Sequence, residues 1–283
     1  MKNFRNTAYV IIAAIAGYML AIKNTNEQRS EIFANILTNA TYIDLTQILD
    51  TNIPNGPGPE AAKIETLLSH TPGEGVMNGT GSIHRYSFPG QWGTHVDPPI
   101  HFIKDLRTLE EIELNEMILP LVVLDIHEKV EANPDYQVSM EDVRVWEKVY
   151  GSIPEKTFVA LRTDWSKRWP NTDLIRNWDE TGVSHSPGWS MEVLKYLAEQ
   201  RNVTAIGHET MDTDIGKLAA VGNYPLETYF LSQNKYQIEN MKALDKVPQW
   251  GAFIITAWPL PKAGDGFPAR VFALIPKQLT DNK

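Results

Sequence analysis

The chain has 283 residues, of which 42% are hydrophobic and 22% are charged, a composition that is ordinary for a folded globular protein. Its formal net charge of −9, with Lys167-Arg168 as too short a basic run to form a patch, argues against nucleic acid as a partner. The absence of cysteine excludes a disulfide framework, a thiolate nucleophile and a cysteine-based zinc site.

The first 24 residues differ in composition from the rest. Lys2 and Arg5 precede an apolar run over residues 8–22, and polar residues follow it. This run has the length of the apolar part of a signal peptide and falls short of the ~20 residues that span a bilayer. We expect residues 1–24 to be a signal peptide or an N-terminal membrane anchor, so that the protein is periplasmic, secreted or membrane-attached. The alternative is a buried N-terminal helix in a cytoplasmic protein.

Residues 25–40 are polar and are predicted to form a linker or a short helix, followed by one domain over residues 41–280. Two segments dense in Pro and Gly, residues 51–60 and 70–81, are predicted to be loops. Short segments rich in β-branched residues predict strands at Tyr42–Thr46, Ser82–Phe88, Leu121–Ile126, Phe158–Arg162, Val203–Gly207, Gly251–Ala257 and Arg270–Ile275.

Helices are fewer than strands. Ser139 is expected to cap a helix that ends at Gly151, and Ser190 is expected to cap a helix over Met191–Gln200. A further helix is predicted near Leu106–Leu114. Strands and helices mix without strict alternation, which predicts one α/β domain around a mixed sheet.

Residues 91–102 hold the densest group of side chains that can bind a metal. Imidazole and carboxylate groups at short spacing are typical of Zn²⁺ or Mn²⁺ sites. The Pro98-Pro99 pair is expected to prevent a helix, so residues 95 and 97 should face the same side of an extended segment. Any one histidine alone is better explained by packing, and the whole group favours a metal site. Its members are Gln91, His95, Asp97 and His101.

This segment resembles the signature of the cyclase/kynurenine-formamidase family of metal-dependent hydrolases, His-x-Gly-Thr-His-x-Asp-x-Pro-x-His. Gln91 stands where the first His would be, and the other fixed positions match. The resemblance covers about residues 41–277 and implies a cyclase-like fold, a single α/β domain with a mixed, barrel-like β core flanked by helices. The further segments that resemble the family are Ile43–Thr46, Ala160–Trp165, Pro187–Ser190, Ile206–Thr210, Tyr236–Asn240 and Gly266–Arg270.

The resemblance also implies a ligand set. His95 and Asp97 are the expected ligands, with Gln91 as a third through its carbonyl oxygen and Glu239 as the late glutamate of the family. Glu227 stands where two-metal members have a late histidine, and is expected to be a ligand or, alternatively, a solvated helix residue. Gln91 and Glu227 each replace a histidine of the family, so the donor atoms shift from nitrogen to oxygen, which favours harder cations. We expect Mn²⁺ or Zn²⁺, with Mg²⁺ less favoured, and the number of ions is open.

Four other residues are given roles. His101 is the expected general acid/base, because imidazole exchanges protons near neutral pH, and its alternative role is ligand to a second cation. Trp92 is expected to form a wall for a flat aromatic substrate, or else to pack in the core. His208 and Glu209 are expected to contact substrate at the pocket rim, with a hydrogen-bonded turn as the alternative.

The predicted function is that of a metal-dependent amidohydrolase acting on an aryl formamide or a cyclic, lactam-type amide, with metal-activated water and His101 moving the proton. One alternative is a metal-dependent lyase or isomerase on the same scaffold. Another is an exported binding protein that lost turnover through Gln91 and Glu227. The expected partners are a small-molecule substrate, a second copy in a homodimer or homotetramer, as the resemblance implies, and a membrane through residues 8–22.

Overall fold

The computed structural model describes residues 37–54, 62–71, 74–77 and 79–276. The signal peptide or anchor predicted for residues 1–24, and most of the predicted linker, lie outside the described residues. Contacts group Tyr42–Leu274 into one unit, and the two terminal stretches of the chain form another. Within the part that is described, no helix is long and apolar enough to cross a membrane.

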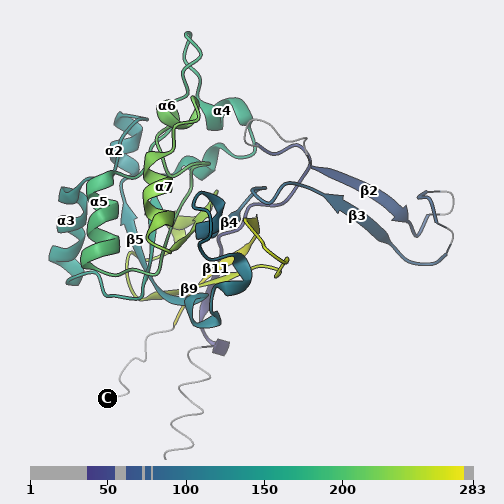
Figure 1. Ribbon diagram of the computed structural model, residues 1–283, viewed down its shortest axis with the longest axis horizontal. Coiled ribbons are helices and arrows are strands. Elements are labelled where there is room, and N and C mark those ends of the chain that lie inside the picture. Colours follow the sequence, from purple (N-terminus) through teal and green to yellow (C-terminus); the bar gives the residue numbers. More distant parts are fainter. Residues whose placement is uncertain (1–36, 55–61, 72–73, 78, 277–283) are drawn as a thin grey trace, which may run out of the picture. The chain divides into compact units, whose positions relative to one another are not determined.

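A mixed sheet forms the centre of the described fold (Figure 1). Its strand order is β1-β11-β9-β5-β6-β7-β8-β4-β10. The strands are β1 (Thr41–Asp44), β4 (His95–Asp97), β5 (Ile118–Asp125), β6 (Phe158–Arg162), β7 (Ala205–His208), β8 (Tyr236–Glu239), β9 (Ala252–Ala257), β10 (Phe267–Pro268) and β11 (Arg270–Ile275).

The four central strands β5 to β8 are parallel, and antiparallel strands join them on both sides. A parallel strand needs cover on both faces, and the apolar run of β5 is correspondingly buried along most of its length. Helices α3 and α5 lie against one face of this part of the sheet (Figure 1), where Val122 and Leu124 pack with Val143 and Trp146. The helices are α2 (His127–Ala132), α3 (Met140–Tyr150), α4 (Thr172–Arg176), α5 (Met191–Lys195), α6 (Gly216–Ala219) and α7 (Pro225–Ser232).

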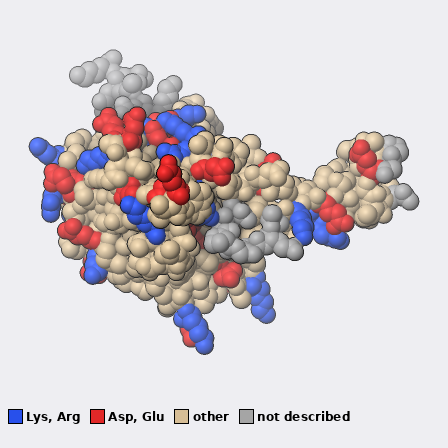
Figure 2. Space-filling model, turned by 90° about the horizontal axis from the view of Figure 1, so that it is seen from above, with Lys and Arg blue, Asp and Glu red and all other residues tan. Residues whose placement is uncertain are grey.

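A second, two-stranded sheet consists of β2 (Lys63–Leu68) and β3 (Ile83–Ser87). One of its faces carries the ion pair between Arg85 and Glu65. On the face of the molecule seen in Figure 2, acidic and basic side chains are interspersed rather than separated by sign.

The predicted fold class, a mixed sheet flanked by helices, is confirmed, and each predicted strand has a counterpart. The caps at Ser139 and Ser190 are also confirmed, since Ser139 accepts a hydrogen bond from the backbone of Asp142 and Ser190 one from the backbone of Val193. The sequence reasoning did not delimit four strands, β2, β4, β8 and β10, or four helices, α2, α4, α6 and α7.

Two local predictions were wrong. The helix predicted near Leu106–Leu114 is replaced by two separate 3₁₀ turns, Leu109–Glu111 and Leu114–Glu116. The backbone becomes extended at Ile112, which ends the first turn, and a second capping box at Glu113 begins the next one. The Pro98-Pro99 pair does not exclude helical structure either. A 3₁₀ turn begins at Pro99, where a missing N–H costs nothing, and carries the chain to His101.

Candidate functional site

The pairing of β4 with β8 assembles the site. The two strands are antiparallel, so His95 lies opposite Glu239 and Asp97 lies opposite Gln237. Because side chains alternate along a strand, residues two apart on each strand share one face, and all four side chains gather there. They are at most 4% exposed, so two paired strands bring polar groups from distant parts of the sequence into the interior.

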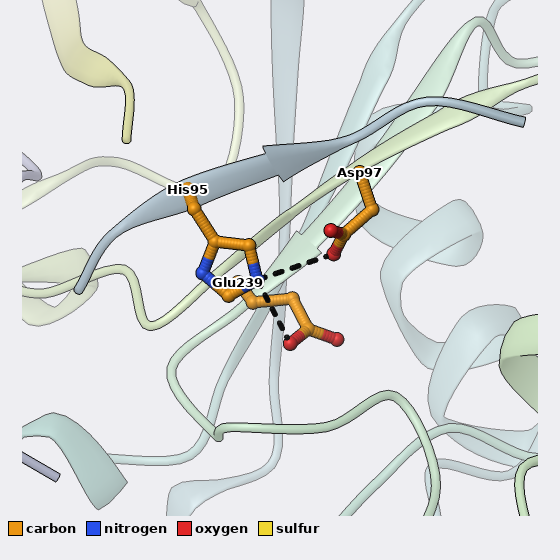
Figure 3. Close-up of side chains that lie close together, drawn as sticks. All are labelled: His95, Asp97 and Glu239. Atoms are coloured by element: carbon orange, nitrogen blue, oxygen red, sulfur yellow. Dashed lines mark ion pairs between the residues drawn. The ribbon is translucent and has the colours of Figure 1, made fainter. Parts of the chain in front are cut away.

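His95, Asp97 and Glu239 point towards one another (Figure 3). His95 Nε2 lies 3.3 Å from Asp97 Oδ2 and 3.5 Å from Glu239 Oε2. Ligand atoms that sit ~2.1 Å from a tetrahedral cation are about 3.4 Å apart. His95 Nδ1 lies 2.9 Å from the carbonyl oxygen of Gly93, to which it donates, so in the neutral imidazole Nε2 is the nitrogen with the lone pair. The spacing and the tautomer therefore both fit a cation held by these three residues.

The buried carboxylates of Asp97 and Glu239 are paired only with histidines among the described residues, so negative charge in the site is incompletely compensated. Burial alone would raise the pKa of Asp97, but the charges of His95 and His101 and hydrogen bonds from His95 and Gln237 lower it to about 2. Burial raises the pKa of Glu239 well above the ordinary value, and neighbouring carboxylates add to the rise. Among the described residues, the ion-pair partners of Asp97 and Glu239 are histidines rather than Lys or Arg.

Gln237 holds the carboxylates together. Thr213 donates to its Oε1 at 2.7 Å, which turns its amide nitrogen towards the acids. That nitrogen lies 2.8 Å from Glu227 Oε1, 2.9 Å from Glu239 Oε1 and 3.4 Å from Asp97 Oδ2. Asp97 Oδ1 is buried and has no hydrogen-bond partner among the described residues. An unpaired buried carboxylate oxygen is costly, and a cation would satisfy it.

A cavity of about 340 Å³ opens onto this cluster. One part of its lining is apolar and consists of Pro54, Pro89, Trp92, Phe102, Met211 and Tyr224. The polar part consists of Gln91, His95, Asp97, His101, Asp212, Glu227, Glu239 and Asn240. The aromatic side of the cavity is ordered by an edge-to-face contact between Phe102 and Tyr224, whose ring centroids are 5.6 Å apart.

His101 lies at the mouth of the cluster. Its side chain is 25% exposed, and its Nε2 is 3.9 Å from Asp97 Oδ1. Gln91 Nε2 lies 3.3 Å from His101 Nδ1 and also donates to the carbonyl of Asp265. The structure thus brings Gln91 to the cavity as expected, but it turns the amide nitrogen towards His101, where it orients the imidazole.

Glu227 and Trp92 both line the cavity. Glu227, on α7, is 4% exposed, so the alternative of a solvated helix residue is wrong. Trp92 lines the cavity and also packs with Ile53 and Ala62, so the core packing given as its alternative role is present, and its contact with a substrate stays a prediction. Its indole N–H donates to the backbone of Asp50, which fixes the ring in place.

His208 and Glu209 do not line the cavity. The Glu209 carboxylate accepts hydrogen bonds from the backbone of Thr163 and Asp164 and from the Ser166 hydroxyl. Successive residues at the end of β7 point in opposite directions, which directs Glu209 into this loop and away from the cluster. His208 is wholly buried behind Glu239.

Sequence reasoning missed several residues of the site. Gln237 stands two residues before Glu239, so strand alternation was a usable signal for it. Phe102 follows His101 and Asn240 follows Glu239 in the sequence, so adjacency to a predicted site residue was a weak signal for both. Tyr224 had no signal, since only the packing of α7 brings it to the cavity.

Comparisons with known proteins identify relatives of this chain. The isatin hydrolase of Roseibium aggregatum is 32% identical over 190 residues, covering 65% of this chain and 72% of that protein. The solved structure of isatin hydrolase A from Ralstonia solanacearum is 32% identical with a TM-score of 0.78, covering 88% of this chain and 97% of that one. An isatin hydrolase bound to the product analogue thioisatinate is 26% identical with a TM-score of 0.79, covering 89% and 99%.

The family described as "Putative cyclase" matches residues 43–215, which is more than half of the chain. That span contains the segment with His95 and Asp97. The chain therefore belongs to this cyclase family and has its cyclase-like fold.

Proposed function

We propose that this protein is a metal-dependent hydrolase that opens a cyclic amide fused to an aromatic ring, a substrate of the isatin type. The observation that carries the proposal is the cluster of His95, Asp97 and Glu239 at the floor of a cavity with an aromatic side. Relatives named isatin hydrolases, with high coverage of both chains, support the lactam substrate. A cavity of about 340 Å³ has the size of a small-ligand pocket.

The donor set fits a divalent cation. The three candidate ligand atoms lie within 4.8 Å of one another, and in the described part of the chain no group forms a hydrogen bond to the buried Asp97 Oδ1. One imidazole and two carboxylates suit Mn²⁺ or Zn²⁺. When bound, such a cation lowers the pKa of water and polarises an acyl oxygen.

The side chains of the chain supply the remaining steps. Trp92, Phe102 and Tyr224 bind and orient the flat ring. His101 would take a proton from the attacking water through Nε2 and return it to the amide nitrogen. This requires the tautomer with its proton on Nδ1, so the Gln91 amide, whose nitrogen faces Nδ1 in this structure, would turn its oxygen to accept from Nδ1. The water oxygen bonds to the carbonyl carbon, the carbon–nitrogen bond breaks, and the products are an aryl amine and a carboxylate on one molecule.

The test is hydrolysis by purified protein loaded with Mn²⁺ or Zn²⁺, with isatin and N-formylkynurenine as rival substrates. We expect isatin to be opened and solvent oxygen to enter the product, which a lyase or isomerase would not show. His101→Ala should lower kcat by about 10²–10⁴-fold while the metal stays bound. His84 is an exposed histidine of β3, and His84→Ala is the matched control, which should leave kcat unchanged.

Other results would overturn the proposal in different ways. Preference for N-formylkynurenine would assign an aryl formamidase. Metal binding without solvent oxygen in any product would favour the lyase or isomerase alternative. Failure to bind any divalent cation would favour a binding protein without turnover.

Export or membrane attachment through residues 8–22 stays a prediction. N-terminal sequencing of the mature protein from fractionated cells tests it, and an intact N-terminus in the cytoplasm would contradict it. The homodimer or homotetramer also stays a prediction, which light scattering on the purified full chain tests.

A further inference from the structure

His208 stands behind the candidate metal cluster without touching the cavity. It is the last residue of β7 and is fully buried. Trp189 Nε1 lies 3.2 Å from its Nδ1, and Glu239 Oε1 lies 3.3 Å from its Nε2. The imidazole of His208 therefore lies between the indole of Trp189 in the core and the carboxylate of Glu239, which is a candidate metal ligand.

The tautomer of His208 follows from its neighbour. An indole N–H can only donate, so Nδ1 must accept, and the neutral ring carries its proton on Nε2. Nε2 forms no hydrogen bond to any described residue, so its N–H is available to Glu239.

The two oxygens of Glu239 have different surroundings. Oε1 accepts a hydrogen bond from Gln237 at 2.9 Å, and His208 Nε2 lies 3.3 Å from it without hydrogen-bond geometry in this structure. Oε2 faces His95 Nε2 at 3.5 Å. The carboxylate is thus oriented with one oxygen towards donors of the core and the other towards the cluster.

We propose that His208 is a positioning residue for the cation, which holds Glu239 Oε1 so that Oε2 is presented for binding, and that Trp189 sets the tautomer that this requires. The assignment rests on the proposed function, because it presumes a cation at His95, Asp97 and Glu239. Partners behind metal ligands typically change metal affinity by about 10–100-fold.

The experiment measures Mn²⁺ binding to the chelator-treated full chain by titration calorimetry, beside the melting temperature of the metal-free protein. The main variant combines Trp189→Phe with His208→Leu. It removes both polar partners at once and leaves no unpaired indole N–H, so its fold should survive. We expect a Kd for Mn²⁺ about 10–100-fold weaker than that of the wild type.

Two further variants separate positioning from packing. His208→Gln keeps an acceptor for Trp189 and a donor for Glu239, and should restore the affinity to near the wild-type value. Ile206→Val trims the same strand within the apolar cluster, and should change the melting temperature without changing the Kd.

A double variant that binds Mn²⁺ as tightly as the wild type would overturn the positioning role. So would a loss of affinity in Ile206→Val as large as in the double variant, since packing alone would then explain it. A wild-type protein that binds neither Mn²⁺ nor Zn²⁺ would overturn the proposed function itself, which is a distinct outcome.

Discussion

His95 and Glu239 are direct partners in the register of β4 and β8, and their side chains meet at 3.5 Å between Nε2 and Oε2. The two residues are far apart in the sequence, and a short strand pair makes them neighbours. Backbone pairing therefore sets the distance between them, which leaves little freedom for the site to rearrange.

Asp97→Asn keeps the size of the side chain and removes its charge. We expect Mn²⁺ affinity to fall by more than about 100-fold, beyond the usual effect of a residue behind the ligands, and hydrolysis to fall with it. Calorimetry and a steady-state assay measure both. Asp245→Asn, a partly exposed partner of Lys167, is the control and should leave both values near those of the wild type.

The metal-free protein should lose stability as the pH rises from about 4 to about 6. Burial raises the pKa of Asp212 from 3.8 to about 6, so the native state binds more protons than the unfolded state across this window. The stability that Asp212 contributes is fully present at a pH below its pKa in the unfolded state. It is lost as the pH rises through its pKa in the native state. Burial and neighbouring carboxylates raise the pKa of Glu227 and Glu239, which adds to the fall in stability. Burial lowers the pKa of His208, which opposes the fall, and the three carboxyl groups outweigh this one histidine.

The melting temperature of chelator-treated protein, followed from pH 4 to pH 7, measures this effect and should fall by at least about 2 °C. Mn²⁺ added at pH 7 should reverse the fall, because it binds the native state. Asp212→Asn should reduce the fall in melting temperature between pH 4 and pH 7. A melting temperature that rises steadily over this range in the metal-free protein would contradict the prediction.

Gly266→Ala should impair catalysis with little effect on stability. An added Cβ would collide with the amide end of Gln91, a flexible group that can move away, and would thereby pull Gln91 off His101. We expect kcat to fall by about 10-fold at a nearly unchanged melting temperature. Gln91→Ala should have a similar effect, and the two changes together should not add, because they act through the same contact.

Gly90→Ala is the contrasting variant. Its Cβ would collide with the backbone carbonyl of Gly266, which cannot move without shifting the chain. We expect a loss of about 1–3 kcal/mol in the free energy of unfolding, measured by urea denaturation. Equal stability in the Gly90 and Gly266 variants would show that this close approach of two backbones is not needed.

Glu209→Ala should destabilise the fold and leave the site intact. The buried carboxylate accepts from the backbone of Thr163 and Asp164, and its loss leaves both N–H groups unpaired. We expect a cost of about 2–4 kcal/mol in urea denaturation, with unchanged KM and Mn²⁺ affinity. Glu128→Ala on the exposed side of α2 is the control. A raised KM at full stability would instead restore a substrate-binding role for Glu209.

Local chemistry explains what could be predicted before the fold was known. The alternation of β-branched residues marked β6 and β11 to the residue, and Ser139 and Gly151 marked both ends of α3. These signals depend on neighbours within a few residues, where steric and capping preferences dominate. The helix expected near Leu106–Leu114 did not form because the backbone becomes extended at Ile112, and a new turn begins after Glu113.

The sequence by itself determined that an imidazole and a carboxylate share one side of an extended segment, because residues 95 and 97 are two apart on a strand. Only the tertiary structure decided which other side chains lie beside this imidazole and this carboxylate. The register of β4 on β8 selected Gln237 and Glu239, and the end of β7 placed His208 behind the cluster and sent Glu209 elsewhere. Such contacts join residues that are from about thirty to more than a hundred positions apart, and their geometry depends on pairing and packing that no local pattern specifies.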